Sequence, residues 1–177
     1  MTETIVTEAL LSAAVTTGVS VHEKAILPVT ALVFSPALLE SCKTNVCGYY
    51  NKSWVCPPAC ESVEEQKKKI FSHKNLLVFT TMHALEDSFD YDGMSKGREL
   101  HSLLTLELKK ILNTSVYGAG NCPICKTCAF PSPCIHPEKR IGSVEAVGID
   151  VTSLSKAAGI AYNNGQNTVT FFSIAVF

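Results

Sequence analysis

The sequence contains eight cysteines, and all of them fall into two groups of four. The first group is spaced Cys-x4-Cys-x8-Cys-x3-Cys and the second Cys-x2-Cys-x2-Cys-x5-Cys. A cubane iron–sulfur cluster needs four thiolates that converge from a loop wrapped around it, and Cys-x2-Cys-x2-Cys is the spacing by which ferredoxins supply three of them. The predicted ligands of two [4Fe-4S] clusters are therefore Cys42, Cys47, Cys56, Cys60, Cys122, Cys125, Cys128 and Cys134.

The spacing of the second group is the stronger indication of an iron–sulfur cluster, yet it departs from the ferredoxin pattern. Five residues rather than three precede Cys134, and Ile135 follows it where the ferredoxin run has proline. A simple ferredoxin repeat is therefore excluded. Assigning each group to its own cluster is the simplest pairing, but one cysteine of each group could instead ligate the other group's cluster, as in two-cluster ferredoxins.

Structural zinc and disulfides are the competing uses of these thiols. Zinc sites favour two Cys-x2-Cys pairs, a pattern that the second group's three evenly spaced cysteines and the first group's longer gaps fit poorly. Glu3 and Glu8 precede the apolar residues 9–19, and no Lys or Arg comes before Lys24, which disfavours a secretory signal. The expected compartment is the cytoplasm, where clustered thiols stay reduced and bind metal.

The residues between the cysteines suit a cluster-binding loop. Glycines at positions 48, 118 and 120 allow tight turns, and prolines at positions 57, 58, 123, 131 and 133 stiffen the loops. Tyr49 and Trp54 are candidates to shield the first cluster from water, and His136 is a candidate donor to a cluster sulfur. For each of the three, ordinary packing or a surface position is the alternative.

The composition is that of a globular protein. The chain has 177 residues, of which 46% are apolar and 18% charged, and its formal net charge is -1. This length suits a single iron–sulfur-binding domain, residues 1–177, with cluster loops at about 42–60 and 118–140. The absence of a basic excess argues against nucleic acid as a partner, and no apolar run is long enough to span a membrane.

Hydrophobic periodicity predicts the α/β class. Residues 75–82 form a near-continuous apolar run, typical of a strand buried on both faces, and residues 93–112 have the spacing of an amphipathic helix. Further helices are expected at 8–14, 61–72 and within 143–158, and further strands within 20–34 and at 168–177. We expect one compact domain with a mixed sheet, flanking helices and two cysteine-rich loops, the first of which follows a strand.

Three segments together resemble a known family. They read CGYYNKSWVCPP from Cys47, GAGNCPICKTCAFPSPCIHPEKR from Gly118 and SVEAVGIDV from Ser143. This ordered series is similar to the predicted metal-binding family called domain of unknown function 2284, found largely in anaerobic bacteria and archaea, and the similarity extends over residues 18–177. The resemblance implies metal binding and an anaerobic setting. It supplies no established reaction.

The chain departs from that family's usual pattern in two places. Ile135 stands where a basic residue usually precedes the His-Pro-Glu sequence, and residues 142–144 replace a Pro-Ser-Met-like segment. A basic contact at position 135 is therefore not expected here.

The expected function is electron transfer between the two clusters and a redox partner protein. No nucleotide-binding loop, hydrolase triad signature or S-adenosylmethionine-type Cys-x3-Cys-x2-Cys motif is present, which favours an electron carrier over a catalyst. The first alternative is a redox enzyme with an open or exchangeable iron on one cluster, most readily that of the irregular first group, which would bind a small molecule such as sulfide. The second is a structural zinc-binding interaction module. A homodimer through the strand-like C-terminus is the alternative to an internal position for that strand.

Overall fold

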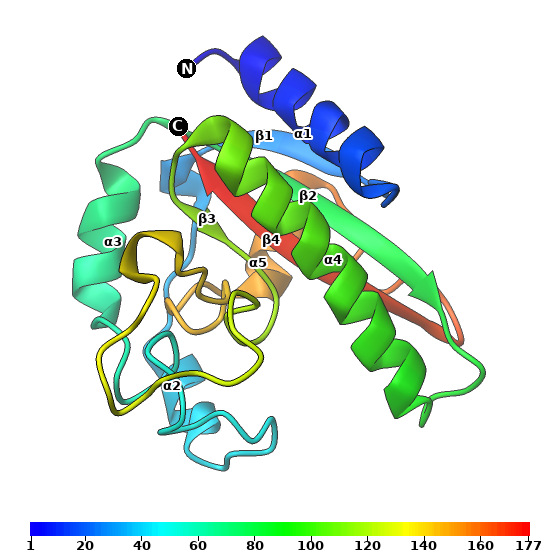
Figure 1. The fold of residues 1–177 in the computed structure, drawn as a ribbon. Coiled ribbons are helices and arrows are strands. Elements are labelled where there is room, and N and C mark those ends of the chain that lie inside the picture. The colour runs from blue at the N-terminus through cyan, green and yellow to red at the C-terminus, as the bar shows by residue number, and fades with distance from the viewer.

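The computed structural model describes residues 1–177 as a four-stranded sheet with helices on both faces (Figure 1). The strand order is β1-β2-β4-β3, and every neighbouring pair is antiparallel. The elements in chain order are α1 (Glu3–Thr17), β1 (Lys24–Pro28), η1 (Val29–Ala31), α2 (Ala37–Cys42), α3 (Val63–Phe71), β2 (Asn75–Ala84), α4 (Tyr91–Leu112), β3 (Val116–Tyr117), η2 (Pro137–Lys139), α5 (Val151–Ala158) and β4 (Thr168–Val176).

The central strand β2 separates two apolar cores, because its successive side chains point to opposite faces of the sheet. Leu77 and Phe79 pack with α1 and α4 on one face. Leu76 and Val78 pack with residues of α3, α5 and the 144–149 segment on the other. All four side chains are fully buried, which confirms the predicted strand covered on both faces.

The helices begin and end at residues with clear capping chemistry. Thr2 caps α1, and Gly18, with φ of 68°, ends it. At the start of α3, Ser62 and Glu65 form a reciprocal capping box. The Asp150 carboxylate accepts hydrogen bonds from the first turn of α5. None of the helices combines the length and apolar character needed to cross a membrane.

The predicted α/β class is confirmed, but the sheet is antiparallel rather than mixed. Helix α4 does carry the chain from β2 to β3 in the manner of a crossover between parallel strands. The C-terminal strand β4 then inserts between β2 and β3 and runs antiparallel to both. Strands β2 and β3 run in the same direction, but β4 lies between them, so they do not pair with each other. The predicted terminal strand is internal to the sheet.

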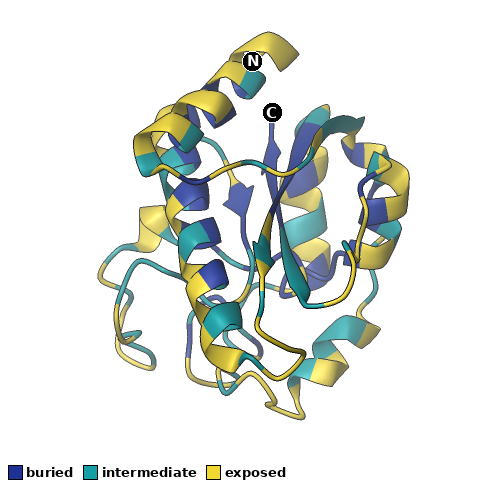
Figure 2. Ribbon diagram, turned by 90° about the vertical axis from the view of Figure 1, so that its right-hand side faces the viewer, coloured by how far each residue is buried: buried dark blue, intermediate teal, exposed yellow.

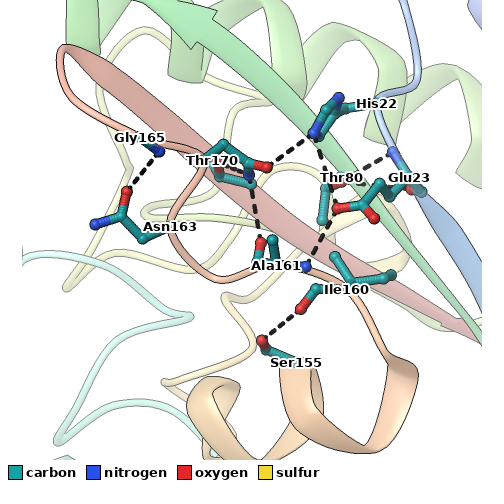
Figure 3. A network of polar contacts seen from close by, with 10 residues as sticks. His22, Glu23, Thr80, Ser155, Ile160, Ala161, Asn163, Gly165 and Thr170 are labelled. Carbon is teal, nitrogen blue, oxygen red and sulfur yellow. Dashed lines mark hydrogen bonds and ion pairs between the residues drawn. The ribbon is translucent and has the colours of Figure 1, made fainter.

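Polar contacts tie the connection between α5 and β4 to the start of β1 (Figure 3). The backbone N–H of Ala161 donates to Glu23 Oε2 at 3.2 Å, and His22 Nε2 lies 3.1 Å from Asn164 Oδ1. Asn164 in turn donates to Thr170 Oγ1 at 2.8 Å. This network holds the long connection against the sheet.

Both cysteine segments lie at the end of the molecule opposite α1 and the two chain termini (Figure 1). This end is largely irregular and mostly half-buried or exposed, in contrast to the buried sheet (Figure 2). The apolar cores thus form the scaffold, and the cysteine segments form a separate layer of loops below it.

Candidate metal centre

The first cysteine segment begins inside a short helix rather than after a strand. Cys42 is the last residue of α2, so the prediction that the segment follows a strand was wrong. Beyond it the chain makes successive turns in which Asn45, Gly48 and Asn51 adopt positive φ values of 54°, 78° and 56°. Asparagine and glycine are the residues that tolerate this conformation best. The turns fold the segment back on itself, so that its four cysteines gather at one place.

The four thiols of the first group influence one another electrostatically. Burial, opposed by the Ser53 hydroxyl and assisted by the neighbouring Cys47, Cys60 and Cys42 thiols, raises the pKa of Cys56 to about 11. Burial and then the Cys47 thiol also raise the pKa of Cys42. Thiols that disfavour each other's ionisation in this way need a cation to become thiolates together. Cys47 is the only fully exposed cysteine of the eight.

All four cysteines of the second group line a single small cavity. Its walls also include Trp54, Ile124, Ile135 and His136, and they are predominantly apolar. Gly120, with φ of 73°, turns the chain into this segment, as the sequence predicted. The second group therefore surrounds one small, predominantly apolar space. That arrangement is the one a cluster-binding loop requires.

Two thiols in this cavity differ in their proton affinity. Burial, followed by the neighbouring Cys122, Cys134 and Cys128 thiols, raises the pKa of Cys125. Burial also acts to raise the pKa of Cys128, but hydrogen bonds from the backbone N–H groups of Phe130 and Trp54 and from the Ser53 hydroxyl outweigh it. The pKa of Cys128 is consequently lowered. Hydrogen bonds to sulfur favour the thiolate, which is the metal-binding form.

The two cysteine segments pack directly against each other. Trp54 Nε1 donates to the carbonyl oxygen of Ser132 at 2.8 Å, and its ring lies edge-on to Phe130 with centroids 5.1 Å apart. Cys56 Sγ lies 3.8 Å from Asn121 Oδ1, next to Cys122 in the chain. The two groups therefore form one continuous site rather than two isolated loops.

The three residues suggested to surround the ligands occupy different places. Trp54, expected to shield the first group, reaches across to the second and lines its cavity. His136 lines the same cavity. Tyr49 is exposed, with 37% of its surface accessible, and lines neither of the two cavities that cysteines line. The structure thus places Trp54 and His136 beside the thiols and leaves Tyr49 at the surface.

The donor set fits a thiolate-bound iron–sulfur cluster chemically. Each group supplies four thiols, none of which is used in a disulfide. No three side chains among the cysteines, histidines, aspartates and glutamates lie close enough together to hold a single metal ion.

Several residues beside the thiols were not singled out from the sequence. Ser53 is fully buried and donates to Cys128, and Asn121 contacts Cys56. Asn121 directly precedes Cys122, but Ser53 lies three residues before Cys56, so the sequence gives little indication of these roles. Lys109, at the end of the amphipathic helix, lies near Cys122 and Glu138, and nothing in the helical spacing marks it.

Comparison with known proteins identifies a family. The sequence model of the family described as predicted metal-binding protein (DUF2284) matches residues 25–177. The chain belongs to this family, as the cysteine-containing motifs indicated. No curated protein and no solved structure matches the chain.

Proposed function

We propose that this member of the predicted metal-binding family holds two [4Fe-4S] clusters, one on each cysteine group, and passes single electrons to or from a partner redox enzyme in an anaerobe. The observation that carries the proposal is the convergence of Cys122, Cys125, Cys128 and Cys134 on one cavity. The family match supports metal as the ligand.

The spacing of the cysteines favours a cluster over zinc. Structural zinc sites typically use two Cys-x2-Cys pairs. The second group instead has three evenly spaced cysteines, which is the spacing by which ferredoxins supply three ligands of a cubane.

The surroundings of the second group suit a redox centre. When bound, the cluster would supply reversible one-electron chemistry. Backbone N–H and hydroxyl donors to Cys128 stabilise negative charge on its sulfur, and Trp54 and Ile124 contribute apolar surface to the cavity. Hydrogen bonds to sulfur and exclusion of water are the means by which proteins set cluster potentials.

The contact between the two segments supports electron passage between the groups. The Cys56 sulfur lies 3.8 Å from the side chain of Asn121, which is covalently joined to Cys122, so the two groups of proposed ligands lie close together. Both segments lie in irregular loops at one end of the molecule, where a partner protein can approach (Figure 1).

Metal analysis after purification without oxygen tests the proposal. We expect about eight irons and about eight acid-labile sulfides per chain, and distinct electron paramagnetic resonance signals from two reduced clusters. Cys125→Ser and Cys56→Ser should each lower the iron to about four per chain, since each removes a ligand of one cluster. Ser41→Ala, an exposed change beside Cys42, is the control and should retain all the iron. A colourless protein loaded with zinc would refute the proposal.

A redox enzyme with an exchangeable iron on the first cluster is the second candidate. The observation that favours it is the exposure of Cys47, which contrasts with the partial burial of the other seven cysteines. If one iron binds an external ligand such as sulfide instead of a thiolate, Cys47→Ala should keep a complete first cluster. Loss of half the iron in that variant would indicate four cysteine ligands and favour the electron carrier.

A further inference from the structure

A second cavity, of about 290 Å³, lies between the two cysteine segments and the scaffold. Cys60 of the first segment lines one side, and η2 with Arg140 from the second segment lines another. The remaining wall comes from α3, the end of α4 and the strand β3. Trp54, Val55 and Arg140 also line the cavity of the second cysteine group, so the two cavities adjoin.

The charges around this cavity are unequal. Three cationic side chains and two carboxylates line it: Lys69, Lys109, Arg140, Glu61 and Glu138. Lys69 forms an ion pair with Glu61, so these two charges offset each other. Two cations, Lys109 and Arg140, remain against one carboxylate, Glu138.

The two remaining cations have unused hydrogen-bond donors. Lys109 is half-buried and forms no ion pair or hydrogen bond with the protein. Arg140 uses its Nε to donate to the carbonyl oxygen of Pro137 at 3.2 Å, and both of its terminal amino groups have no protein partner. A half-buried ammonium and the end of a guanidinium fork are strong donors to an anion.

Two polar neutral residues of the cavity are hydrogen-bonded to one another and to Glu61. Tyr117 Oη donates to Gln66 Oε1 at 3.2 Å, and Gln66 Nε2 donates to Glu61 Oε2 at 2.7 Å. These hydrogen bonds occupy much of the acceptor capacity of that wall. The charged groups left free are the donors of Lys109 and Arg140 and one acceptor, the Glu138 carboxylate.

We propose that this cavity binds a small oxyanion, either a carboxylate or a tetrahedral oxyanion, between Lys109 and Arg140. Its volume lies just below the range of roughly 300–1,000 Å³ typical of ligand pockets, which suits an ion of few atoms rather than a nucleotide. The guanidinium fork matches pairs of oxygens on one centre, a geometry that chloride cannot offer. The proposal concerns binding only and does not require that the thiols hold iron.

Isothermal titration calorimetry on the protein as purified without oxygen tests this proposal. Sodium sulfate, sodium phosphate and sodium acetate are titrated separately to about 10 mM, with sodium chloride at matched ionic strength as the control salt. We expect saturable binding of one anion per chain for at least one of the three oxyanions, and none for chloride. Sulfate or phosphate without acetate would indicate a tetrahedral ligand, and acetate alone a carboxylate.

Three variants locate the site. Lys109→Met and Arg140→Gln should each weaken binding at least about tenfold, because each removes a charged donor. Glu138→Gln should strengthen it, because it removes the uncompensated carboxylate; a variant that merely misfolds could not do so. Lys156→Met on α5, outside the cavity, is the charge-matched control and should bind like the native chain.

Two results would overturn the inference. One is the absence of saturable binding for all three oxyanions. The other is binding that Lys109→Met and Arg140→Gln leave unchanged, or that chloride reproduces. Metal content is measured on the same samples, so a zinc-loaded protein that still binds an oxyanion would refute the proposed electron transfer and leave the anion site standing.

Discussion

Trp54 donates its indole N–H to the carbonyl oxygen of Ser132, 2.8 Å away, across 78 positions of the chain. The same ring packs edge-on against Phe130. One side chain of the first cysteine segment thus fastens the loop that carries the second. Because the loops contain little regular structure, such single contacts determine how the two thiol groups face each other.

Two substitutions of Trp54 should lower the free energy of unfolding by different amounts, because Trp54 holds the two cysteine segments together. Trp54→Phe removes the donor but keeps an aromatic ring, and we expect a loss of about 0.5–1.5 kcal/mol in the free energy of unfolding. Trp54→Ala also removes the aromatic pair and should cost at least about 1 kcal/mol more. Urea unfolding is followed by circular dichroism, since Trp54 is the only tryptophan and its fluorescence is lost.

The matched control is Tyr49→Phe, which removes a polar group from an exposed aromatic of the same segment. Its effect should stay within about 0.5 kcal/mol. If Trp54→Phe were as stable as the native chain, the hydrogen bond to Ser132 would contribute nothing and the segments would be held together by other contacts.

Local signals in the sequence predicted most of the scaffold. The apolar run of β2 and the caps of α1 and α3 act within a few residues, so their effects can be read from the sequence. The order of the sheet could not be read in this way, because β4 pairs with residues about 90 positions earlier. Nothing local distinguishes a strand inserted between β2 and β3 from one at an edge.

The same limit applies to the candidate site. The four cysteines of the second group lie close together in the sequence, and all four line one cavity. The contact between Cys56 and Asn121 and the cavity shared by Cys60 and Arg140 depend on how distant loops pack. On α4, Ile111 is 44% exposed, whereas the neighbouring Leu112 is buried, so apolar character alone does not identify the buried face.

Gly148 should not tolerate a side chain, because its φ is 86° and a Cβ would lie 2.8 Å from Val63 Cγ2. We expect Gly148→Ala to lower the free energy of unfolding by about 2–4 kcal/mol, which combines about 1 kcal/mol of backbone strain with overpacking. Gly159 has a similar φ of 65° and open space around it, so Gly159→Ala should cost only about 1 kcal/mol. Chemical denaturation compares the two.

A double mutant separates strain from overpacking at Gly148. Val63→Ala removes both methyl groups that a Cβ would meet, so the effects of Gly148→Ala and Val63→Ala should be less than additive. Equal losses for Gly148→Ala and Gly159→Ala, or strict additivity with Val63→Ala, would show that Val63 does not restrict this position.

Asn164 should contribute more to stability than its neighbour Asn163. Asn164 joins three segments, through His22, Thr170 and the carbonyl oxygen of Ala161 (Figure 3). Asn163 accepts one local bond from Gly165 N–H. Asn164→Ala is expected to cost about 1–2 kcal/mol and Asn163→Ala about 0.5 kcal/mol in thermal or urea unfolding. Equal costs would mean that the contacts to His22 and Thr170 add no net stability.

A buried chain of hydrogen bonds runs through His101, and its direction follows from one carbonyl group. Thr105 Oγ1 donates to the His101 carbonyl oxygen at 2.8 Å, so the Ser173 hydroxyl must donate to Thr105. His101 Nε2 must then donate to Ser173, at 2.7 Å, which leaves Nδ1 to accept from Thr81 at 2.9 Å. Burial lowers the pKa of His101, which keeps the ring neutral with its proton on Nε2. Nitrogen-15 chemical shifts of the imidazole check this tautomer.

The burial of His101 also predicts that the stability of the protein depends on pH. Burial, and then the nearby His83, lower the pKa of His101 from 6.5 to about 3. Between these two pKa values the unfolded chain binds a proton at this residue and the folded chain does not. The contribution of His101 to the free energy of unfolding is therefore fully present above pH 6.5 and is lost as the pH falls toward 3. Between pH 7 and pH 5 this one residue should lower the free energy of unfolding by about 2 kcal/mol.

His101→Gln isolates this contribution, because an amide can still donate to Ser173 and accept from Thr81 without titrating. We expect the variant to be less stable than the native chain at pH 7, since a ring is lost from between Phe79 and Phe171, but to lose about 2 kcal/mol less on acidification to pH 5. His83, whose pKa is also lowered by burial, acts in the same direction, so His83→Gln is measured in parallel. Suppose that His101→Gln loses as much stability between pH 7 and pH 5 as the native chain, whereas His83→Gln loses much less. The proton would then be taken up at His83, and a lowered pKa of His101 would be contradicted.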